Sequence, residues 1–363
     1  MPTKKNKKKS LIRGHGFYGL PFTVETFHGM PYRMFGDTGL RVSSIGLGTW
    51  KIGYPKSGDG SRIDEKSALK IFDAAIEEGV TFWDTANRYN NSSGNSERII
   101  GKWLSANPDQ RRSIELATKI YGTMDGLTPN FCRLSRVNVL EAVYASLDRL
   151  RTDRIEVLQF HWFDESTPAE ESLMAAEDLI AQDILRYVGV SNFSLAQLEI
   201  YAAWKDALPR ARVRSVQNQF DILHGEDSAR TGVLEYCAGH NLSFIPWSPL
   251  RGGLLSGRYL DKRKIRRGDR LFDEKRLDQE LTQPVLEKLK KLDILAGQGG
   301  LTIPQLVLAY MLRIPGMGPI IAACSSAKQV RENARAGKIV LAEEQVRAVE
   351  QIIQRAYSQG YRL

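Results

Sequence analysis

The sequence predicts a single α/β domain of the (β/α)8 class, the TIM barrel. Eight short apolar runs recur along the 363 residues, and longer segments with apolar residues at helical spacing separate them. Strands that are apolar throughout are typical of a parallel sheet buried on both faces. Eight strand–helix units favour a closed barrel over an open doubly wound sheet, and no low-complexity linker divides the chain in two.

The predicted strands follow one another from residue 44 onward. They cover residues 44–48, 80–84, 114–118, 155–160, 185–190, 213–218, 242–247 and 318–323. Helices are expected at 65–78, 134–150, 168–182, 281–297 and 342–357. A Gly- and Arg-rich loop over residues 251–280 follows the seventh strand, and loops of this length in compact domains are usually functional or disordered.

Residues 1–30 precede this pattern and are predicted to form a basic, flexible extension, with the barrel domain over 31–363. The formal charge is +9, and residues 1–13 hold six Lys and Arg and no acid, which leaves 9 − 6 = +3 for the rest. We therefore expect no specific nucleic-acid partner. A solvated arm is the simpler interpretation of the extension, and weak binding to a polyanion is the alternative.

Composition indicates an ordinary soluble protein. The chain is 42% hydrophobic, has no apolar run of about 18 residues that would span a membrane, and has no hydrophobic segment after its basic start. Three cysteines, Cys132, Cys237 and Cys324, lie far apart and outside metal-ligand spacing. We therefore expect a reducing compartment, the cytoplasm, with no disulfide framework and no metal site.

Polar residues stand where the predicted strands end, which is where (β/α)8 barrels build their active sites. They are Gly48-Thr49-Trp50, Asp84, Lys119, His161, Ser191-Asn192, Gln217 and Trp247-Ser248. Each has a structural explanation when taken alone: an aspartate can cap a helix, for example, and an asparagine can serve a turn. Their joint occurrence at one end of the barrel favours an active site.

These side chains suit the reduction of a carbonyl group by hydride transfer. Tyr89 could donate the proton that the developing alkoxide needs. Lys119 could make that tyrosine ionise more readily, and Asp84 could hold Lys119 as its ion-pair partner. His161 could donate a hydrogen bond to the substrate oxygen. No Rossmann fingerprint competes, because Gly46-Leu47-Gly48 lacks the third glycine, and there is no phosphate loop of the Walker type.

Eight distinctive stretches occur in order between residues 31 and 340. They are YRMFGDTGLRVSSIGLGTW (32–50), GVTFWDTANRYNNSSGNSERIIGKWL (79–104), ATKI (117–120), LQFHW (158–162), RYVGVSNFS (186–194), VQNQF (216–220), WSPLRGGLLSGRY (247–259) and CSSAKQVRENARA (324–336). In order and spacing they resemble the aldo-keto reductases over most of the chain. The long loop after the seventh strand looks most like the branch with potassium-channel β-subunits and bacterial glyceraldehyde-phosphate-type reductases.

The resemblance implies that NADPH binds in an extended form across the barrel mouth. It implies a catalytic tetrad of Asp84, Tyr89, Lys119 and His161, with Tyr89 as the general acid. Around these, the implied cofactor-binding residues are Gly48, Thr49, Trp50, Asp84, Ser191, Asn192, Gln217, Trp247, Ser248, Leu250, Gly252, Arg258, Arg270, Ser325, Gln329, Glu332 and Asn333. Arginine suits a bidentate phosphate contact, which favours NADPH over NADH, although Arg263, Arg266, Arg267 and Arg270 all remain candidates for the 2′-phosphate.

The substrate is expected to be a small carbonyl compound. Aromatic residues predicted to line its pocket are Trp50, Tyr54, Tyr121, Trp162 and Phe220, although packing at the rim would explain them equally well. Oligomer formation is possible.

Two other functions stay open. One is an NADPH-binding redox sensor or regulatory subunit with little turnover, with the basic extension as its partner-binding arm. Channel β-subunits carry Asn where this chain has His161, which favours a working enzyme. The other is a barrel enzyme that acts on phosphorylated metabolites without a nicotinamide.

Overall fold

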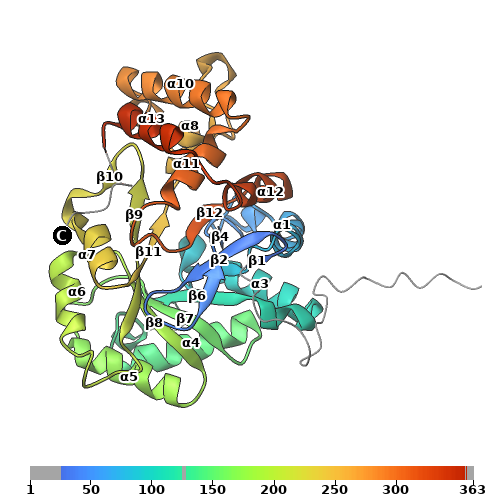
Figure 1. Ribbon diagram of the computed structural model, residues 1–363. Helices are drawn as coiled ribbons and strands as arrows, with labels where there is room; N and C mark the ends of the chain where they lie inside the picture. Colours follow the sequence, from blue (N-terminus) through green and yellow to red (C-terminus); the bar gives the residue numbers. More distant parts are fainter. Residues whose placement is uncertain (1–25, 125–127, 356, 358–363) are drawn as a thin grey trace, which may run out of the picture.

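The computed structural model describes residues 26–124, 128–355 and 357, and its centre is a barrel of eight parallel strands (Figure 1). The strands are β4 (Ile45–Gly48), β5 (Phe82–Asp84), β6 (Glu115–Ile120), β7 (Ile155–Phe160), β8 (Leu185–Ser191), β9 (Val213–Asp221), β11 (Ser243–Trp247) and β12 (Ile320–Ala323). Each predicted strand is present, and its ends differ from the prediction by no more than three residues. The predicted (β/α)8 barrel is confirmed.

The strands pair in chain order and close on themselves. Parallel pairing runs from β4 through β9 to β11, and β12 pairs with β4 on the other side. A parallel bridge between Phe244 and Met317 joins β11 to the segment before β12. There Phe244 N donates to Gly316 O at 2.8 Å, and Gly318 N donates to Phe244 O at 2.7 Å. Closure brings the carboxyl ends of all eight strands together at one mouth.

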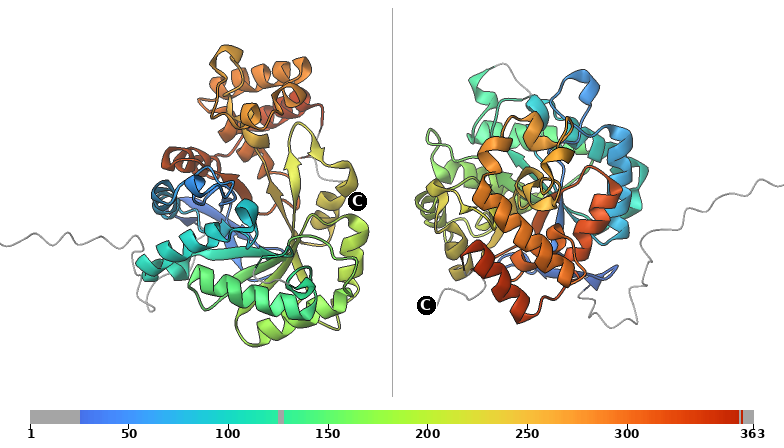
Figure 2. Two further views of the ribbon diagram at one scale, coloured as in Figure 1. Left: turned by 180° about the vertical axis from the view of Figure 1, so that it is seen from behind. Right: turned by 90° about the horizontal axis from the view of Figure 1, so that it is seen from above.

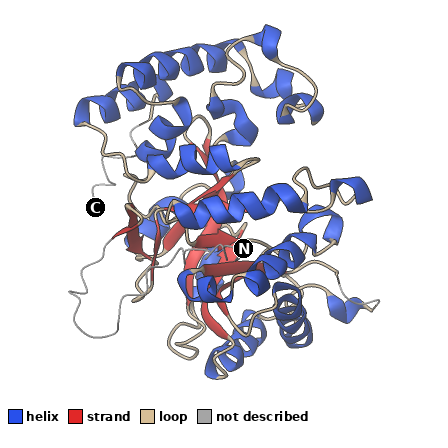
Figure 3. Ribbon diagram, turned by 90° about the vertical axis from the view of Figure 1, so that its right-hand side faces the viewer, coloured by secondary structure: helices blue, strands red, loops and turns tan. Residues whose placement is uncertain are grey.

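Helices cover the outside of the barrel (Figures 2 and 3). They are α1 (Glu65–Glu77), α3 (Asn95–Ala106), α4 (Arg136–Leu150), α5 (Ala169–Ala181), α6 (Leu195–Ala202), α7 (Val233–Gly239), α11 (Ile303–Met311) and α12 (Ala327–Ala336). Several begin at side chains that cap them. Ser194 and Thr302 form capping boxes with the glutamine three residues further on, and Asp64 accepts from Ser67 N.

A small antiparallel sheet lies at the amino-terminal end of the barrel. It consists of β1 (Thr26–Phe27), β2 (Met30–Met34) and β3 (Arg41–Ser43). Phe35 and Val42, beside and within these strands, are fully buried and pack into the barrel interior with Phe82. The predicted domain boundary at residue 31 falls inside the β1–β2 hairpin. The Lys-rich segment of the predicted extension lies outside the described residues.

The segment predicted as a long loop, residues 251–280, is a chain of short helical turns. They are η5 (Arg251–Ser256), η6 (Lys262–Lys264), α8 (Arg270–Asp273) and α9 (Leu277–Glu280). Beyond them, α10 (Gln283–Gln298) and α13 (Glu343–Ile353) lie together above the barrel in Figure 1. The remaining short elements are α2 (Tyr89–Ser92), β10 (Gly225–Glu226), η1 (Pro55–Ser57), η2 (Pro108–Ser113), η3 (Pro129–Phe131) and η4 (Ser228–Arg230).

Across the described residues, no single helix has the length and apolar composition needed to cross a membrane. Only α10 and α11 taken as a pair pass that test, and they are bent by 91° at the break between them.

Candidate active site

A deep cleft with a volume of about 1640 Å³ opens where the barrel strands end. Pockets for a drug-sized ligand measure roughly 300–1,000 Å³, so this cleft has room for a dinucleotide and a substrate together. All of the predicted site residues line it except Thr49, Lys119 and Phe220. The described residues contain no group of three or more His, Cys, Asp and Glu side chains disposed to hold a metal ion.

Asp84 and Lys119 form a buried ion pair beneath the cleft. Asp84 ends β5 and Lys119 lies on the neighbouring strand β6, so parallel pairing brings the two side chains together. Lys119 Nζ donates to Asp84 Oδ1 at 2.8 Å and Oδ2 at 2.7 Å, and to Thr85 O at 2.9 Å. Lys119 is 1% exposed and does not line the cleft, so it acts on a substrate through its neighbours.

Tyr89 follows β5 at the start of α2 and lies over this ion pair. Its hydroxyl accepts a hydrogen bond from Lys119 Nζ at 2.8 Å and lies 3.3 Å from Asp84 Oδ2. Burial and the Asp84 carboxylate raise the pKa of Tyr89 well above its usual value. Burial and Asp84 outweigh the hydrogen bond by which Lys119 is expected to favour the ionised tyrosine. Tyr89 therefore retains the proton that a general acid must donate.

The backbone after Tyr89 is held in an unusual conformation. Asn90, Asn91 and Ser92 all have positive φ angles, of 56°, 57° and 59°. Such angles cost energy in residues other than glycine and occur often at functional sites. Asn90 fixes the segment, because its Nδ2 donates to Ile52 O at 2.7 Å in the loop after β4.

His161 lies directly after β7, next to the first residue of α2. Its ring meets the Tyr89 ring edge to face, with 6.1 Å between centroids. Burial, Lys119 and Arg88 together lower the pKa of His161 to about 3. The imidazole is therefore neutral at physiological pH and can offer one N–H as a hydrogen-bond donor.

Two glutamines complete the surroundings of Asp84. Gln159 Nε2 and Gln217 Nε2 donate to Asp84 Oδ1 at 3.0 and 2.9 Å, and Gln217 Nε2 also lies 3.0 Å from Gln159 Oε1. Sequence reasoning missed Gln159. The available signal was its position two residues before His161, since alternate residues of a strand face the same side. Gln217 was predicted as a cofactor contact, and in the structure its amide also holds Asp84.

The ends of β8 and β11 form the next part of the cleft. Asn192 Nδ2 donates to His161 O and to Ser191 Oγ, each at 3.1 Å, and Asn192 Oδ1 accepts from Trp247 Nε1 at 3.1 Å. Asn192 thus orients the side chains of Ser191 and Trp247. Trp247 presents an aromatic ring to the cleft, and the Ser191 hydroxyl can donate to a ligand.

The segment after β11 continues the cleft. Ser248, Gly252 and Gly253 have positive φ angles of 57°, 61° and 96°. Leu250 and Gly252 line the cleft beside Arg258 and Arg270. A backbone without bulky side chains at the glycines, next to two guanidinium groups, is suited to the close approach of a phosphate.

The far end of the cleft is formed by residues around the start of α12. Ser325 N and Ser325 Oγ both donate to Gln329 Oε1, at 2.7 and 2.9 Å. Asn333 Nδ2 donates to Cys324 Sγ at 3.3 Å, and Glu332 lines the same end. These are the residues for which the resemblance implied contacts with the adenosine.

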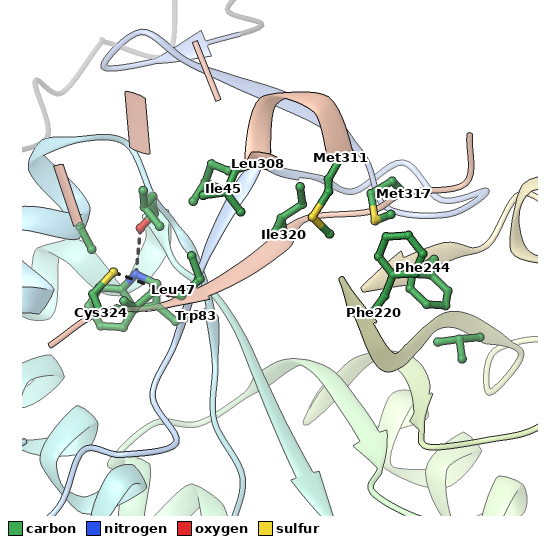
Figure 4. Close-up of a cluster of buried hydrophobic side chains, with 14 of the residues drawn as sticks. Ile45, Leu47, Trp83, Phe220, Phe244, Leu308, Met311, Met317, Ile320 and Cys324 are labelled. Carbon is green, nitrogen blue, oxygen red and sulfur yellow. Dashed lines mark hydrogen bonds between the residues drawn. The ribbon is translucent and has the colours of Figure 1, made fainter. Parts of the chain in front are cut away.

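Besides Lys119, two predicted site residues lie outside the cleft lining. Phe220 is fully buried and packs edge to face against Phe244, with 5.9 Å between centroids, and against Tyr357 (Figure 4). Its placement in the substrate pocket is wrong, because it points from β9 into the core. Thr49 is also buried. Its hydroxyl donates to Asp84 O at 2.9 Å, so it helps to fix the backbone of Asp84 and does not face the cleft.

The other predicted aromatic residues do border the cleft. Trp50, Tyr54, Tyr121 and Trp162 line it, and Trp50 and Trp162 are the most exposed, at 39% and 49%. Arg270 lies over the Trp50 ring, 4.7 Å from its centroid.

The fold and the site define an oxidoreductase barrel that acts on carbonyl groups. The family model described as aldo/keto reductase matches residues 44–354, and the chain belongs to this family. The family generally uses a nicotinamide dinucleotide, and the donors, aromatic ring and guanidinium groups of the cleft fit one.

Similar proteins come from bacteria, plants and fungi. The chain is 34% identical over 334 residues to an uncharacterized oxidoreductase, YrpG, of Bacillus subtilis (strain 168), covering 89% of this chain and 96% of that protein. It is 31% identical over 331 residues to a probable voltage-gated potassium channel subunit beta of Arabidopsis thaliana, covering 90% and 97%. It is 29% identical over 348 residues to versiconal hemiacetal acetate reductase of Aspergillus parasiticus, covering 89% and 96%.

Proposed function

We propose that this enzyme reduces an aldehyde or ketone to the alcohol, with NADPH as the hydride donor and Tyr89 as the general acid. The observation that carries the proposal is the position of the Tyr89 hydroxyl. It accepts from Lys119 Nζ at 2.8 Å, at the edge of a cleft that His161 also lines. A proton donor and a neutral hydrogen-bond donor are what a carbonyl oxygen needs while it gains negative charge.

Each side chain of the site has a separate role in the proposed reduction. A bound reduced nicotinamide supplies the hydride that reaches the carbonyl carbon. Tyr89 gives its hydroxyl proton to the carbonyl oxygen, so the product leaves as a neutral alcohol. Lys119 stabilises the phenolate that remains, and Asp84 holds Lys119 through two hydrogen bonds. His161 donates to the same oxygen as charge develops there.

We infer NADPH rather than NADH because Arg258 and Arg270 line the cleft next to the glycines of η5. Arg258 pairs with Asp269 at 2.6 Å and Arg270 with Glu274 at 2.8 Å, so each guanidinium is held in the cleft wall and retains N–H groups for a phosphate. The ratio of kcat/KM with the two cofactors measures this preference. Replacement of either arginine by glutamine should lower the ratio, on the order of tenfold for a lost charge-assisted contact.

The substitution Tyr89→Phe tests the mechanism. A lost general acid costs roughly 100- to 10,000-fold in turnover, so reduction of 4-nitrobenzaldehyde and methylglyoxal should nearly stop. NADPH should still quench the tryptophan fluorescence, because Tyr89→Phe keeps the aromatic ring. The matched control is Tyr144→Phe on the exposed surface of α4, which should leave turnover unchanged. Full activity in Tyr89→Phe would refute the assignment.

A regulatory subunit with little turnover is the second candidate, and the relative named as a potassium channel subunit is the observation that favours it. His161 favours catalysis, because a neutral donor beside Tyr89 serves the reaction and is not needed to hold a cofactor. Steady-state rates on several aldehydes distinguish the two.

We place the enzyme in a reducing compartment, the cytoplasm, because Cys132, Cys237 and Cys324 are free thiols.

A further inference from the structure

Arg88 lines the cleft directly beside Tyr89, and the reaction proposed above gives its charge no role. In the part of the chain that the structure describes, four arginines line the cleft. Three of them pair with carboxylates, as Arg62–Asp273, Arg258–Asp269 and Arg270–Glu274. Arg88 pairs with no carboxylate of the described residues, so it brings an uncompensated positive charge to the cleft.

Contacts on two sides hold the Arg88 side chain in place. Arg88 Nε donates to Ser92 Oγ at 3.1 Å within the strained segment after Tyr89. On the other side the guanidinium lies against Gly122, after the end of β6. A Cβ at Gly122 would lie 2.1 Å from Arg88 Cδ and 2.7 Å from Nη1. The Nη1 and Nη2 groups have no hydrogen-bond acceptor among the described residues, so they can bind a ligand.

This charge acts at the reacting end of the cleft. Arg88 is one of the groups whose charge lowers the pKa of His161, which places it within electrostatic reach of the proposed carbonyl position. Two of the carboxylates that line the cleft have partners of their own: Asp84 pairs with Lys119, and Glu65 pairs with Lys102. A neutral substrate would bring no opposite charge to the Arg88 guanidinium.

We propose that Arg88 binds a carboxylate on the carbonyl substrate, so that the preferred substrates are oxo acids. This inference rests on the proposed function and names its substrate class. The guanidinium fork matches a carboxylate with two parallel hydrogen bonds. One unpaired arginine balances the single charge of a carboxylate, and a phosphate is the alternative that the test below distinguishes.

Two aldehydes that differ in charge provide the test. 4-Carboxybenzaldehyde and methyl 4-formylbenzoate share the ring and the reacting group. We expect the wild-type enzyme to prefer the acid on the order of tenfold in kcat/KM, which allows for the exposure of Arg88 to solvent. Arg88→Gln should abolish the preference by raising KM for the acid while kcat holds, because the contact is equally strong in the ground and transition states. Arg88→Lys should restore part of it, and added salt should weaken it.

Two further variants separate position from charge. Arg98→Gln removes an exposed arginine of α3 outside the cleft and should leave the preference intact. Gly122→Ala crowds Arg88 without removing its charge and should reduce the preference. Equal kcat/KM for acid and ester in the wild type, or equal losses for both in Arg88→Gln, would overturn the inference. So would an Arg88-dependent preference for glyceraldehyde 3-phosphate over glyceraldehyde without one for the acid, which would assign the site to phosphate.

The ester alone tests the proposed function, because it carries no charge for Arg88 to bind. If neither aldehyde is reduced, the proposed function fails and the anion site is judged by binding. Benzoate and benzamide are then titrated into the protein with NADPH, with tryptophan fluorescence as the signal, because Trp50, Trp162 and Trp247 line the cleft. Tighter binding of benzoate that is lost in Arg88→Gln supports the inference, and equal binding of both compounds overturns it.

Discussion

Asp84 is the residue on which the geometry of the site depends most. It is 2% exposed, and its two oxygens accept from Lys119, Gln159 and Gln217. A buried carboxylate is tolerated only when such donors compensate for the water it has lost. The same contacts fix Lys119 under Tyr89, so one side chain serves both stability and the proposed proton transfer.

Asp84→Asn should therefore cost stability as well as activity. The substitution leaves Lys119 buried without its counter-charge, and breaking a buried pair in this way costs about 3–5 kcal/mol. Denaturant unfolding measures the loss. The control Asp153→Asn breaks an ion pair in which the aspartate is 83% exposed and should change stability by less than about 0.5 kcal/mol. Equal stabilities of wild type and Asp84→Asn would show that the pair contributes nothing to folding.

The pH profile tests the state of His161. Because its pKa is lowered from 6.5 to about 3, the ring stays neutral across the physiological range. We expect kcat/KM for the neutral ester to remain level as the pH falls from about 7.5 to 5.5, with no ionisation near the usual histidine value. An acidic limb near pH 6.5 that disappears in His161→Gln would contradict a neutral histidine. Because the lowered pKa belongs to the folded state, the contribution of His161 to stability should decline as the pH falls below 6.5 toward 3.

At the scale of elements, the segments that follow β4 and β11, two strands separated only by β12, meet at the cleft. Arg62, in the loop after β4, pairs with Asp273 of α8 and donates to Gly268 O at 3.0 Å. Trp50, at the end of the same strand, carries the Arg270 guanidinium over its ring. These contacts join the sides of the cleft where the resemblance places the cofactor phosphates.

Loss of the Arg62–Asp273 pair should speed the release of NADPH. The pair is partly exposed, so its contribution is small, and we expect a roughly two- to fivefold faster dissociation in Asp273→Asn. Stopped-flow fluorescence measures the rate. Asp178→Asn, which removes the partner of Arg136 in an exposed ion pair outside the cleft, is the matched control and should leave the rate unchanged. Identical rates in all three proteins would show that this contact does not limit release.

At the scale of the whole molecule, a second, partly buried polar cluster lies at the amino-terminal end of the barrel, away from the cleft. Tyr32 OH lies 2.6 Å from Thr81 Oγ1, which in turn donates to Glu115 Oε2 at 2.7 Å. Burial, together with the nearby charge of Glu156, raises the pKa of Glu115 from 4.5 to about 7. This cluster joins the β1–β3 sheet to the barrel, so its titration affects the stability of the whole domain.

The contribution of Glu115 to stability should therefore fall as the pH rises from about 4.5 to 7. In this window the folded protein still holds the Glu115 proton that the unfolded chain has released, so folding takes up a proton and becomes less favourable with increasing pH. Glu115→Gln should remove this contribution, because glutamine does not titrate. The free energy of unfolding of the variant relative to the wild type should therefore increase as the pH rises from about 4.5 to 7. Thermal unfolding at several pH values measures it, with Glu141→Gln on the exposed face of α4 as control. Parallel curves for wild type and Glu115→Gln would refute the prediction.

Local patterns were sufficient for the strands and for most of the site. Parallel strands end at one mouth, so polar residues at strand ends can be assigned to a common cleft without knowledge of side-chain packing. This reasoning correctly brought Asp84, His161 and Trp247 together. It failed for Phe220, because the direction in which a strand residue points depends on twist and on the C-terminal segment that packs against it.

The sequence by itself determined the closed barrel and the gathering of most predicted site residues at its mouth, since these depend on apolar periodicity and on the order of residues along the chain. Only the tertiary structure decided which side chains of the site carry a proton and which of its charges are paired with an opposite charge. Burial keeps the proton on Tyr89 and removes it from His161, and the pairing of the other cleft arginines leaves Arg88 uncompensated. Burial and charge pairing arise between residues far apart in the chain, so no local pattern contains them.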